Sequence, residues 1–100
     1  MDISEIRQKV LERRYVYSLH AEEQREAEGL AFAQVREALL NAEMLEEYPD
    51  TGRGESCLVV GFAGKAPIHV VCGRRRDEIV VITVYVPRPP KFLDAWTRGA

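Results

Sequence analysis

The sequence predicts a single α+β domain in which N-terminal helices pack on an antiparallel sheet of about four strands, followed by an extended C-terminal arm. Apolar residues recur at helical spacing in residues 1–43, apolar runs of strand length fill residues 44–86, and residues 87–100 are rich in proline. The chain has 100 residues, 46% hydrophobic and 30% charged, which suits one globular domain, and no linker or internal repeat divides it.

The first half of the chain is predicted to form three helices and, between the first two, a short strand or an extended entry segment. An amphipathic stripe predicts a helix that ends near Arg13, and the stripe consists of Ile3, Ile6 and Val10. The segment "YVYSL" (15–19) alternates like a strand, and a mostly solvated helix follows it and stops at Gly29. A third helix is expected to pack on the core through Phe32, Val35 and Leu39.

The second half is predicted to form an edge strand and two hairpins. The segment "MLEEY" (44–48) is the edge strand, and residues 49–55 are a loop by composition. With Gly64-Lys65 as the first two-residue turn, His69 faces Val60. With Arg75-Arg76 as the second turn, His69 faces Ile82.

Both faces of the predicted sheet are apolar. One face carries Leu58, Val60, Phe62, His69, Val71, Val80, Ile82 and Val84, and the other carries Cys57, Val59, Ile68, Val70, Ile79, Val81, Thr83 and Tyr85. A sheet covered on one side only would alternate with polar residues, so the second face is expected to be covered by the arm or by another subunit. The anchors of such an arm are Phe92, Leu93 and Trp96.

The two cysteines lack the close spacing of a zinc site, and neither a metal nor a cofactor is predicted. Cys57 faces Cys72 in the first predicted hairpin. Both are expected to stay thiols in a reducing cytosol.

The net charge of -2 hides an acidic first half and a basic second half. Residues 1–50 hold six basic and twelve acidic side chains, and residues 51–100 hold eight basic and four acidic ones. This split permits RNA binding on the basic face and, equally, docking between opposite faces. No apolar run approaches the roughly 20 residues that span a bilayer, and no secretion signal is present, so a cytoplasmic protein without membrane contact is expected.

The histidines are candidates for catalysis, because general acid–base work at neutral pH favours imidazole. His20 lies at a predicted helix start, where it could instead only bridge to the sheet. His69 lies among apolar neighbours in a strand, where the alternative is a satisfied core histidine. Tyr85, near the end of the last strand, could donate a proton or stack on a base, or it could fill a half-buried face.

Arginines are the candidates for phosphate binding, because guanidinium forks suit phosphate oxygens. The predicted RNA-binding residues are Arg25, Arg74, Arg75, Arg76 and Arg88, and Arg53, Lys91 and Arg98 are further bases of the second half. Asp77 and Glu78 adjoin the triple arginine, and the alternative is a charged hairpin tip that is only solvated.

The chain resembles a known family along nearly its whole length. The segments "LHAEEQREAEGLAFAQVREAL", "MLEEYPD", "PIHVVCG" and "IVVITVYVP", followed by an arm with a tryptophan and an arginine, resemble the bacterial domain-of-unknown-function family 4258 from Tyr15 to Arg98. That family is similar in layout to toxin ribonucleases of the RelE and BrnT kinds. Its members usually carry arginines four and eight residues after a histidine-alanine step, where this chain has Gln24 and Glu28.

The resemblance implies metal-independent cleavage of RNA by attack of the ribose 2′-hydroxyl. His20 matches the family histidine, Tyr85 matches the closing tyrosine, and His69 and Arg74 lie on the sheet region expected to face RNA. The leading prediction is therefore a RelE/BrnT-like, toxin-like domain that either only binds single-stranded RNA or also cleaves it as an endoribonuclease, with an antitoxin-like protein as a further predicted partner. The alternative is a non-enzymatic interaction module, a homodimer or partner-binding protein.

Overall fold

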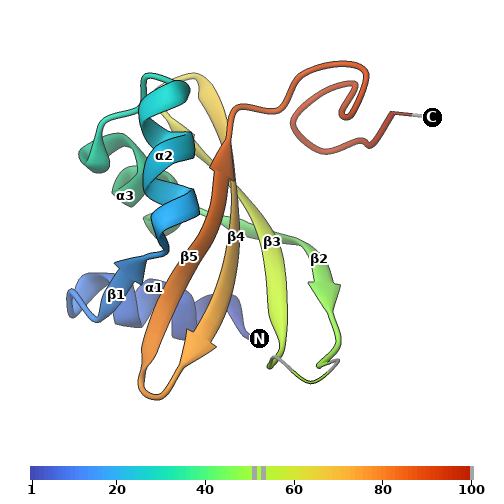
Figure 1. The fold of residues 1–100 in the computed structure, drawn as a ribbon. Helices are drawn as coiled ribbons and strands as arrows, with labels where there is room; N and C mark the ends of the chain where they lie inside the picture. Colours follow the sequence, from blue (N-terminus) through green and yellow to red (C-terminus); the bar gives the residue numbers. More distant parts are fainter. Residues whose placement is uncertain (51, 53, 100) are drawn as a thin grey trace.

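The computed structural model describes residues 1–50, 52 and 54–99, which form three helices and one five-stranded sheet (Figure 1). The helices are α1 (Ile3–Leu11), α2 (Leu19–Ala27) and α3 (Phe32–Leu40). The strands are β1 (Tyr15–Tyr17), β2 (Glu43–Tyr48), β3 (Ser56–Ala63), β4 (Ala66–Arg75) and β5 (Glu78–Tyr85), in the order β1-β5-β4-β3-β2. The α+β class is confirmed. The predicted loop at 49–55 includes Thr51 and Arg53, which lie outside the described residues.

The sheet has one strand more than predicted, and it is mixed rather than antiparallel. β1 runs parallel to β5, with Tyr15 beside Ile79. A run of three residues carries no signal for its partner or its direction, so the sequence pattern could not predict this pair.

Side chains make hydrogen bonds at the start of each helix. The carboxylate of Asp2 accepts a hydrogen bond from the Ser4 N–H (3.0 Å) at the start of α1, and Ser18 caps α2. Ala31 offers no side-chain cap to α3, and Gln34 Oε1 accepts the Ala31 N–H instead (2.7 Å). None of the helices in the described part of the chain is long and apolar enough to cross a membrane.

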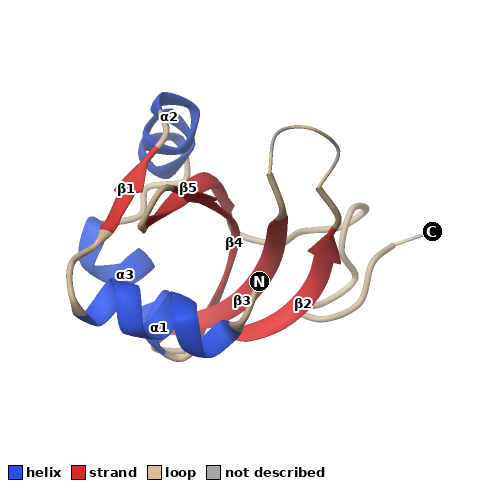
Figure 2. Cartoon of the chain, turned by 90° about the horizontal axis from the view of Figure 1, so that it is seen from below, coloured by secondary structure: helices blue, strands red, loops and turns tan. Residues whose placement is uncertain are grey.

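The core lies between the helices and one face of the curved sheet. Seen from below, the strands form an arc, and α1 and α3 lie on its inner side (Figure 2). Core residues include Ile6, Val10, Val35, Leu39, Val59, Val70, Val81 and Val84. The prediction that Phe32 packs in this core is wrong. Its ring is 51% exposed and contacts Tyr17 and Arg25 at the surface, because it opens α3 at the rim of the sheet.

The β3–β4 hairpin has the predicted register. Ala63 pairs with Ala66 around a turn in which Gly64 has a φ of 60°. Cys57 therefore faces Cys72, and Val60 faces His69, as predicted. Both thiols are free and buried.

The turn of the β4–β5 hairpin lies one residue later than predicted. Arg75 pairs with Glu78, so the turn is Arg76-Asp77 rather than Arg75-Arg76. Asp77 forms one ion pair with Arg14 and another with Lys9 (3.1 Å). These contacts with α1 and the following loop stabilise Asp77 in the turn.

A β-bulge in β5 also changes the predicted pairing. Ile82 is an extra residue in β5, because Cys72 pairs with Val81 and Val71 with Thr83. The prediction that His69 faces Ile82 is therefore wrong, since His69 pairs with Tyr85.

The bulge also exchanges the faces of the last β5 residues. Val84 is buried in the core beside the helices, and Tyr85 lies on the outer face of the sheet with His69. The alternation predicted from the sequence placed Val84 on the face of His69 and Tyr85 on the other face, which is the reverse of what the structure shows.

The arm covers part of the outer face, which was one of the two predicted alternatives. Phe92 is buried, and its ring meets that of His69 edge to face with 4.4 Å between centroids. Trp96 lies beside Phe62, with 6.3 Å between ring centroids. Cover by another subunit stays a prediction.

The edge of β5 that extends beyond β1 is covered by α2. Three polar side chains of this segment satisfy backbone groups along the edge. Ser18 Oγ donates to Ile82 O (3.1 Å), Val84 N–H donates to Gln24 Oε1 (3.1 Å), and Val86 N–H donates to Glu28 Oε1 (3.1 Å).

We expect Gly61→Ala to lower the free energy of unfolding by about 2–3 kcal/mol, measured by urea denaturation. A Cβ at Gly61 would lie 1.9 Å from the backbone oxygen of Ala38, so α3 would have to move away from β3. Gly64→Asn is the control, because the turn is open and asparagine tolerates a positive φ. Equal stability of the two variants would contradict the close approach of α3 to β3.

We expect Gln24→Met to cost about 1–3 kcal/mol of stability, because it keeps the volume but leaves the Val84 N–H without an acceptor. Gln8→Met is the matched control, since the exposed side chain of Gln8 donates a hydrogen bond to Glu12 on the same helix. Chemical denaturation of both variants measures the difference. A loss no greater at residue 24 than at residue 8 would show that α2 does not support the sheet edge.

Candidate nucleic-acid interface

His69 and Tyr85, two of the predicted catalytic residues, lie together under the arm. His69 is fully buried, and its Nε2 lies 2.7 Å from the carbonyl oxygen of Ala95. Because a carbonyl only accepts, Nε2 carries the hydrogen, and Nδ1 of the neutral ring accepts from the Tyr85 hydroxyl (3.2 Å). Burial lowers the pKa of His69 and raises that of Tyr85. Both ring nitrogens of His69 are thus bonded within the protein.

An ion pair holds the end of the arm next to this cluster. The Arg98 guanidinium donates two hydrogen bonds to the carboxylate of Glu46 (2.5 and 2.8 Å), and the Tyr48 hydroxyl donates a third (2.6 Å). These bonds lower the pKa of Glu46 to about 2. The arm therefore covers His69 through a buried aromatic ring, a backbone carbonyl and a charged pair.

His20 lies apart from this cluster. It is exposed on the first turn of α2, which packs along the β5 edge, and it makes no hydrogen bond or ion pair within residues 1–50, 52 and 54–99. His69 lies on the outer face under the arm. No described contact joins the two histidines, and the catalytic role of His20 stays a prediction.

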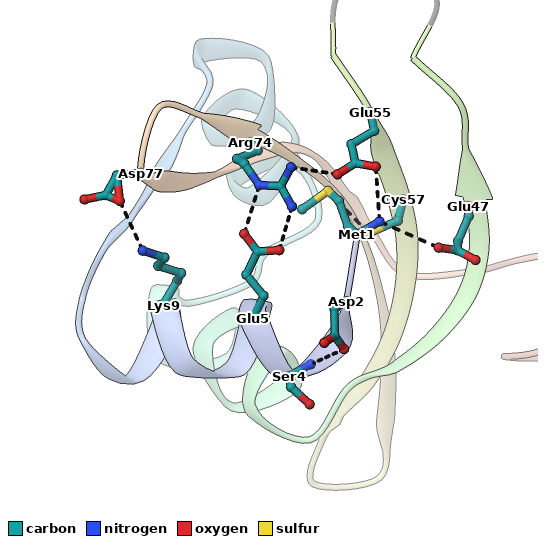
Figure 3. Close-up of polar contacts among 10 residues, drawn as sticks. All are labelled: Met1, Asp2, Ser4, Glu5, Lys9, Glu47, Glu55, Cys57, Arg74 and Asp77. Carbon is teal, nitrogen blue, oxygen red and sulfur yellow. Dashed lines mark hydrogen bonds and ion pairs between the residues drawn. The ribbon is translucent and has the colours of Figure 1, made fainter.

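Arg74 is paired with two carboxylates, although its side chain is still 38% exposed. Figure 3 shows its guanidinium between Glu5 and Glu55. It donates two hydrogen bonds to Glu5 (2.9 and 2.6 Å) and one to Glu55 (2.7 Å), and these lower the pKa of both carboxyl groups. The Met1 amino group lies 3.5 Å from Glu55 and 3.6 Å from Glu47. Arg74 thus links β4 to α1 and to the start of β3.

Two more of the predicted RNA-binding arginines are also engaged inside the fold. Arg25 donates to the Leu30 carbonyl (2.6 Å) and lies over the ring of Phe32 (3.9 Å to the centroid). Arg88 donates to both carboxylate oxygens of Glu28 (3.2 and 2.9 Å). Their charges are partly or wholly compensated.

Arg75 and Arg76 are exposed, and further bases gather next to them. Ile79 N–H donates to Arg14 O (3.1 Å), so the loop between α1 and β1 lies against the start of β5. This contact places Arg13 and Arg14 near the β4–β5 turn, and Lys9 reaches the same turn through Asp77. We call this group the basic tip, and it consists of Lys9, Arg13, Arg14, Arg75 and Arg76. Asp77 pairs with two of the five, and the other three make no ion pair among the described residues.

The backbone of the basic tip is strained at two arginines. Arg13 has a φ of 59° and Arg76 a φ of 58°, and they are the non-glycine residues with positive φ in the described part of the chain. Glycine or asparagine adopts this conformation at lower cost. Residues in such conformations cluster at functional sites, which makes the basic tip the candidate interface.

Sequence reasoning missed three of the five residues of the basic tip. Arg13 is expected only near the end of a helix, and nothing in residues 9–14 links Lys9, Arg13 and Arg14 to residues 74–78. No local signal could have found them, because their position depends on the contact of the loop after α1 with β5. The described residues enclose no pocket for a small molecule, and no group of three or more His, Cys, Asp or Glu among them is arranged to hold a metal ion.

A family model described as "Domain of unknown function (DUF4258)" matches residues 17–86. No match to the chain was found among curated proteins, and none among solved structures. The similarity to RelE and BrnT toxins therefore stays a prediction. The matched segment contains Arg75 and Arg76 but not Arg13 and Arg14.

We expect the stability of the protein to fall as the pH falls from about 7 to about 5, and to fall less in His69→Gln. The folded-state pKa of His69 lies below its ordinary value of 6.5, so in this window the unfolded chain binds a proton that the folded chain does not. The stabilisation is complete above the unfolded pKa and is lost as the pH falls toward the folded one. Urea denaturation at several pH values measures it. Identical pH profiles of the two proteins would contradict a buried, neutral His69.

Proposed function

Since the chain belongs to the DUF4258 family, whose description assigns no activity, we propose a function from the chain's own surface: it binds the phosphate backbone of single-stranded RNA through the basic tip. The observation that supports this most is the left-handed backbone at Arg13 and Arg76. An L-residue in that conformation costs about 1–2 kcal/mol, and glycine would avoid most of it. Arginine at both positions makes sense when the guanidinium groups are needed.

The arrangement of the basic tip suits a flexible strand of phosphates. Its arginines come from two loops and a strand end, and all four are exposed. Tyr15 directly follows Arg14, but its ring is half-buried and packs against the core, so the proposal rests on the charges. Contacts between basic side chains and phosphates do not depend on the base sequence.

The proposal is limited to binding. Cleavage by the predicted residues would require His69, whose two ring nitrogens are bonded to Ala95 and Tyr85 beneath the arm. General acid–base work requires a ring that reaches the substrate. His20 is exposed, but no described acid or base is bonded to it. We therefore expect RNA to be bound and recovered intact, and cleavage that is lost in His20→Ala would show that the predicted ribonuclease was the better hypothesis.

We expect the double variant Arg13→Gly/Arg76→Gly to be as stable as the wild type or more stable, and to bind RNA more weakly. Removing two arginine–phosphate contacts should weaken binding of a single-stranded RNA by about tenfold at low salt. It should also lower the slope of log Kd against log salt concentration by about 1.4. Glycine relieves the positive φ at both sites, so a loss of folding cannot explain weaker binding. Fluorescence anisotropy and thermal unfolding measure the two quantities.

The matched control is Lys65→Gln/Lys91→Gln, which removes two exposed positive charges from the other end of the molecule. It should bind RNA nearly as well as the wild type. An equal loss of RNA affinity in the control and in the double variant would show that binding depends on net charge and not on the basic tip. Unchanged binding by the double variant would exclude the basic tip as the site.

A further inference from the structure

The arm is a loop closed by its own hydrogen bonds, and it presents apolar side chains to solvent. It closes on itself through backbone hydrogen bonds from Leu93 N–H to Thr97 O (2.8 Å) and from Gly99 N–H to Lys91 O (2.9 Å). The carboxylate of Asp94 accepts from the N–H groups of Trp96 and Thr97 (2.8 Å each). Leu93 is nevertheless 63% exposed and Trp96 44% exposed.

This combination is typical of a protein-binding surface. A large aromatic side chain on a loop that is already ordered loses little conformational entropy when it is buried by a partner. Tryptophan is also enriched among the residues that dominate binding energies. Positive charges flank the pair, since Lys91 lies in the same loop and Lys65 lies in the β3–β4 turn, three residues from the Phe62 ring that Trp96 approaches.

An exposed stripe of α2 has the complementary character. Leu19, Glu22, Glu23 and Glu26 are spaced by three and four residues and so lie on one face of the helix. Leu19 is 71% exposed, and the three carboxylates that follow are exposed too. The opposite side of α2 covers the β5 edge through Gln24 and Glu28, so this stripe faces away from the sheet.

The positions of the arm and the stripe permit a two-fold symmetric dimer. Figure 1 shows α2 and the arm on either side of the C-terminal end of β5, at the same end of the molecule. A two-fold axis between them would set the arm of each copy on the α2 stripe of the other, and such a reciprocal contact closes without forming a chain of molecules. The basic tip lies at the opposite end of β5 and stays free.

We propose that the chain forms a homodimer in which Leu93 and Trp96 of one copy dock on the Leu19–Glu26 stripe of its partner. The apolar residues of the two surfaces bury each other, and Lys65 and Lys91 face the three glutamates. Charge complementarity favours a second copy over an unrelated partner, because the acidic surface that the arm needs is present on the same chain. The proposal is independent of RNA binding, which uses the basic tip.

Sedimentation velocity at micromolar concentrations tests the dimer. We expect a dimer for the wild type and monomers for Trp96→Ser and for Glu22→Lys/Glu23→Lys/Glu26→Lys. Leu11→Ser is the matched control, because Leu11 is also a large exposed apolar residue (57%) but belongs to α1, outside both surfaces. It should sediment as the wild type does. Circular dichroism confirms that each variant is folded.

A charge exchange tests the pairing itself. Lys65→Glu/Lys91→Glu should be monomeric, and its combination with the three glutamate-to-lysine changes in one chain should restore the dimer. A monomeric wild type, a dimer that survives Trp96→Ser or the glutamate changes, or a combined variant that stays monomeric would each overturn the proposal. RNA binding by the Trp96→Ser monomer is expected to match that of the wild type, which separates this test from that of the basic tip.

Discussion

One extra residue in β5 determines which side chains the sheet presents on each face. Because Ile82 has no partner in β4, the last residues of β5 exchange faces, so that Val84 enters the core and Tyr85 meets His69. The same stretch of β5 offers its backbone groups to α2, where Ser18 and Gln24 accept or donate the bonds that a neighbouring strand would supply. Without the bulge, the arm would find no histidine–tyrosine pair to cover, and the edge contacts of α2 would lose their register.

The charges of the chain mostly serve the fold, and this decides which of them can serve a ligand. Glu28 accepts from the backbone N–H of Val86, directly after β5, and from Arg88. Gln24 accepts from the Val84 N–H, and an arginine, which only donates, could not replace either side chain in these bonds. Arg74 likewise donates its hydrogen bonds to two carboxylates, those of Glu5 and Glu55. Among the described residues, the exposed charges that make no ion pair include Arg13, Arg75 and Arg76 at the basic tip, Glu22 and Glu23 on α2, and Lys65 and Lys91 near the arm.

Sequence patterns predicted the helices, the β3–β4 register and the arm, because each depends on local periodicity or on a turn residue such as Gly64. They could not predict the parallel β1, the bulge at Ile82 or the exposure of Phe32, which depend on contacts between distant segments. The candidate site divided in the same way. Arg75 and Arg76 were found from their own segment, whereas Arg13 joins them only through the contact of its loop with β5.

Nuclear magnetic resonance of the isotope-labelled protein during titration with a short single-stranded RNA tests most directly whether RNA binds at the strained arginines. We expect the amide signals that move to belong to residues 9–15 and 74–78, with those of α2 and the arm unchanged. Movement confined to α2 or to the arm, or no movement at low salt, would contradict the assignment of the basic tip as the RNA-binding surface.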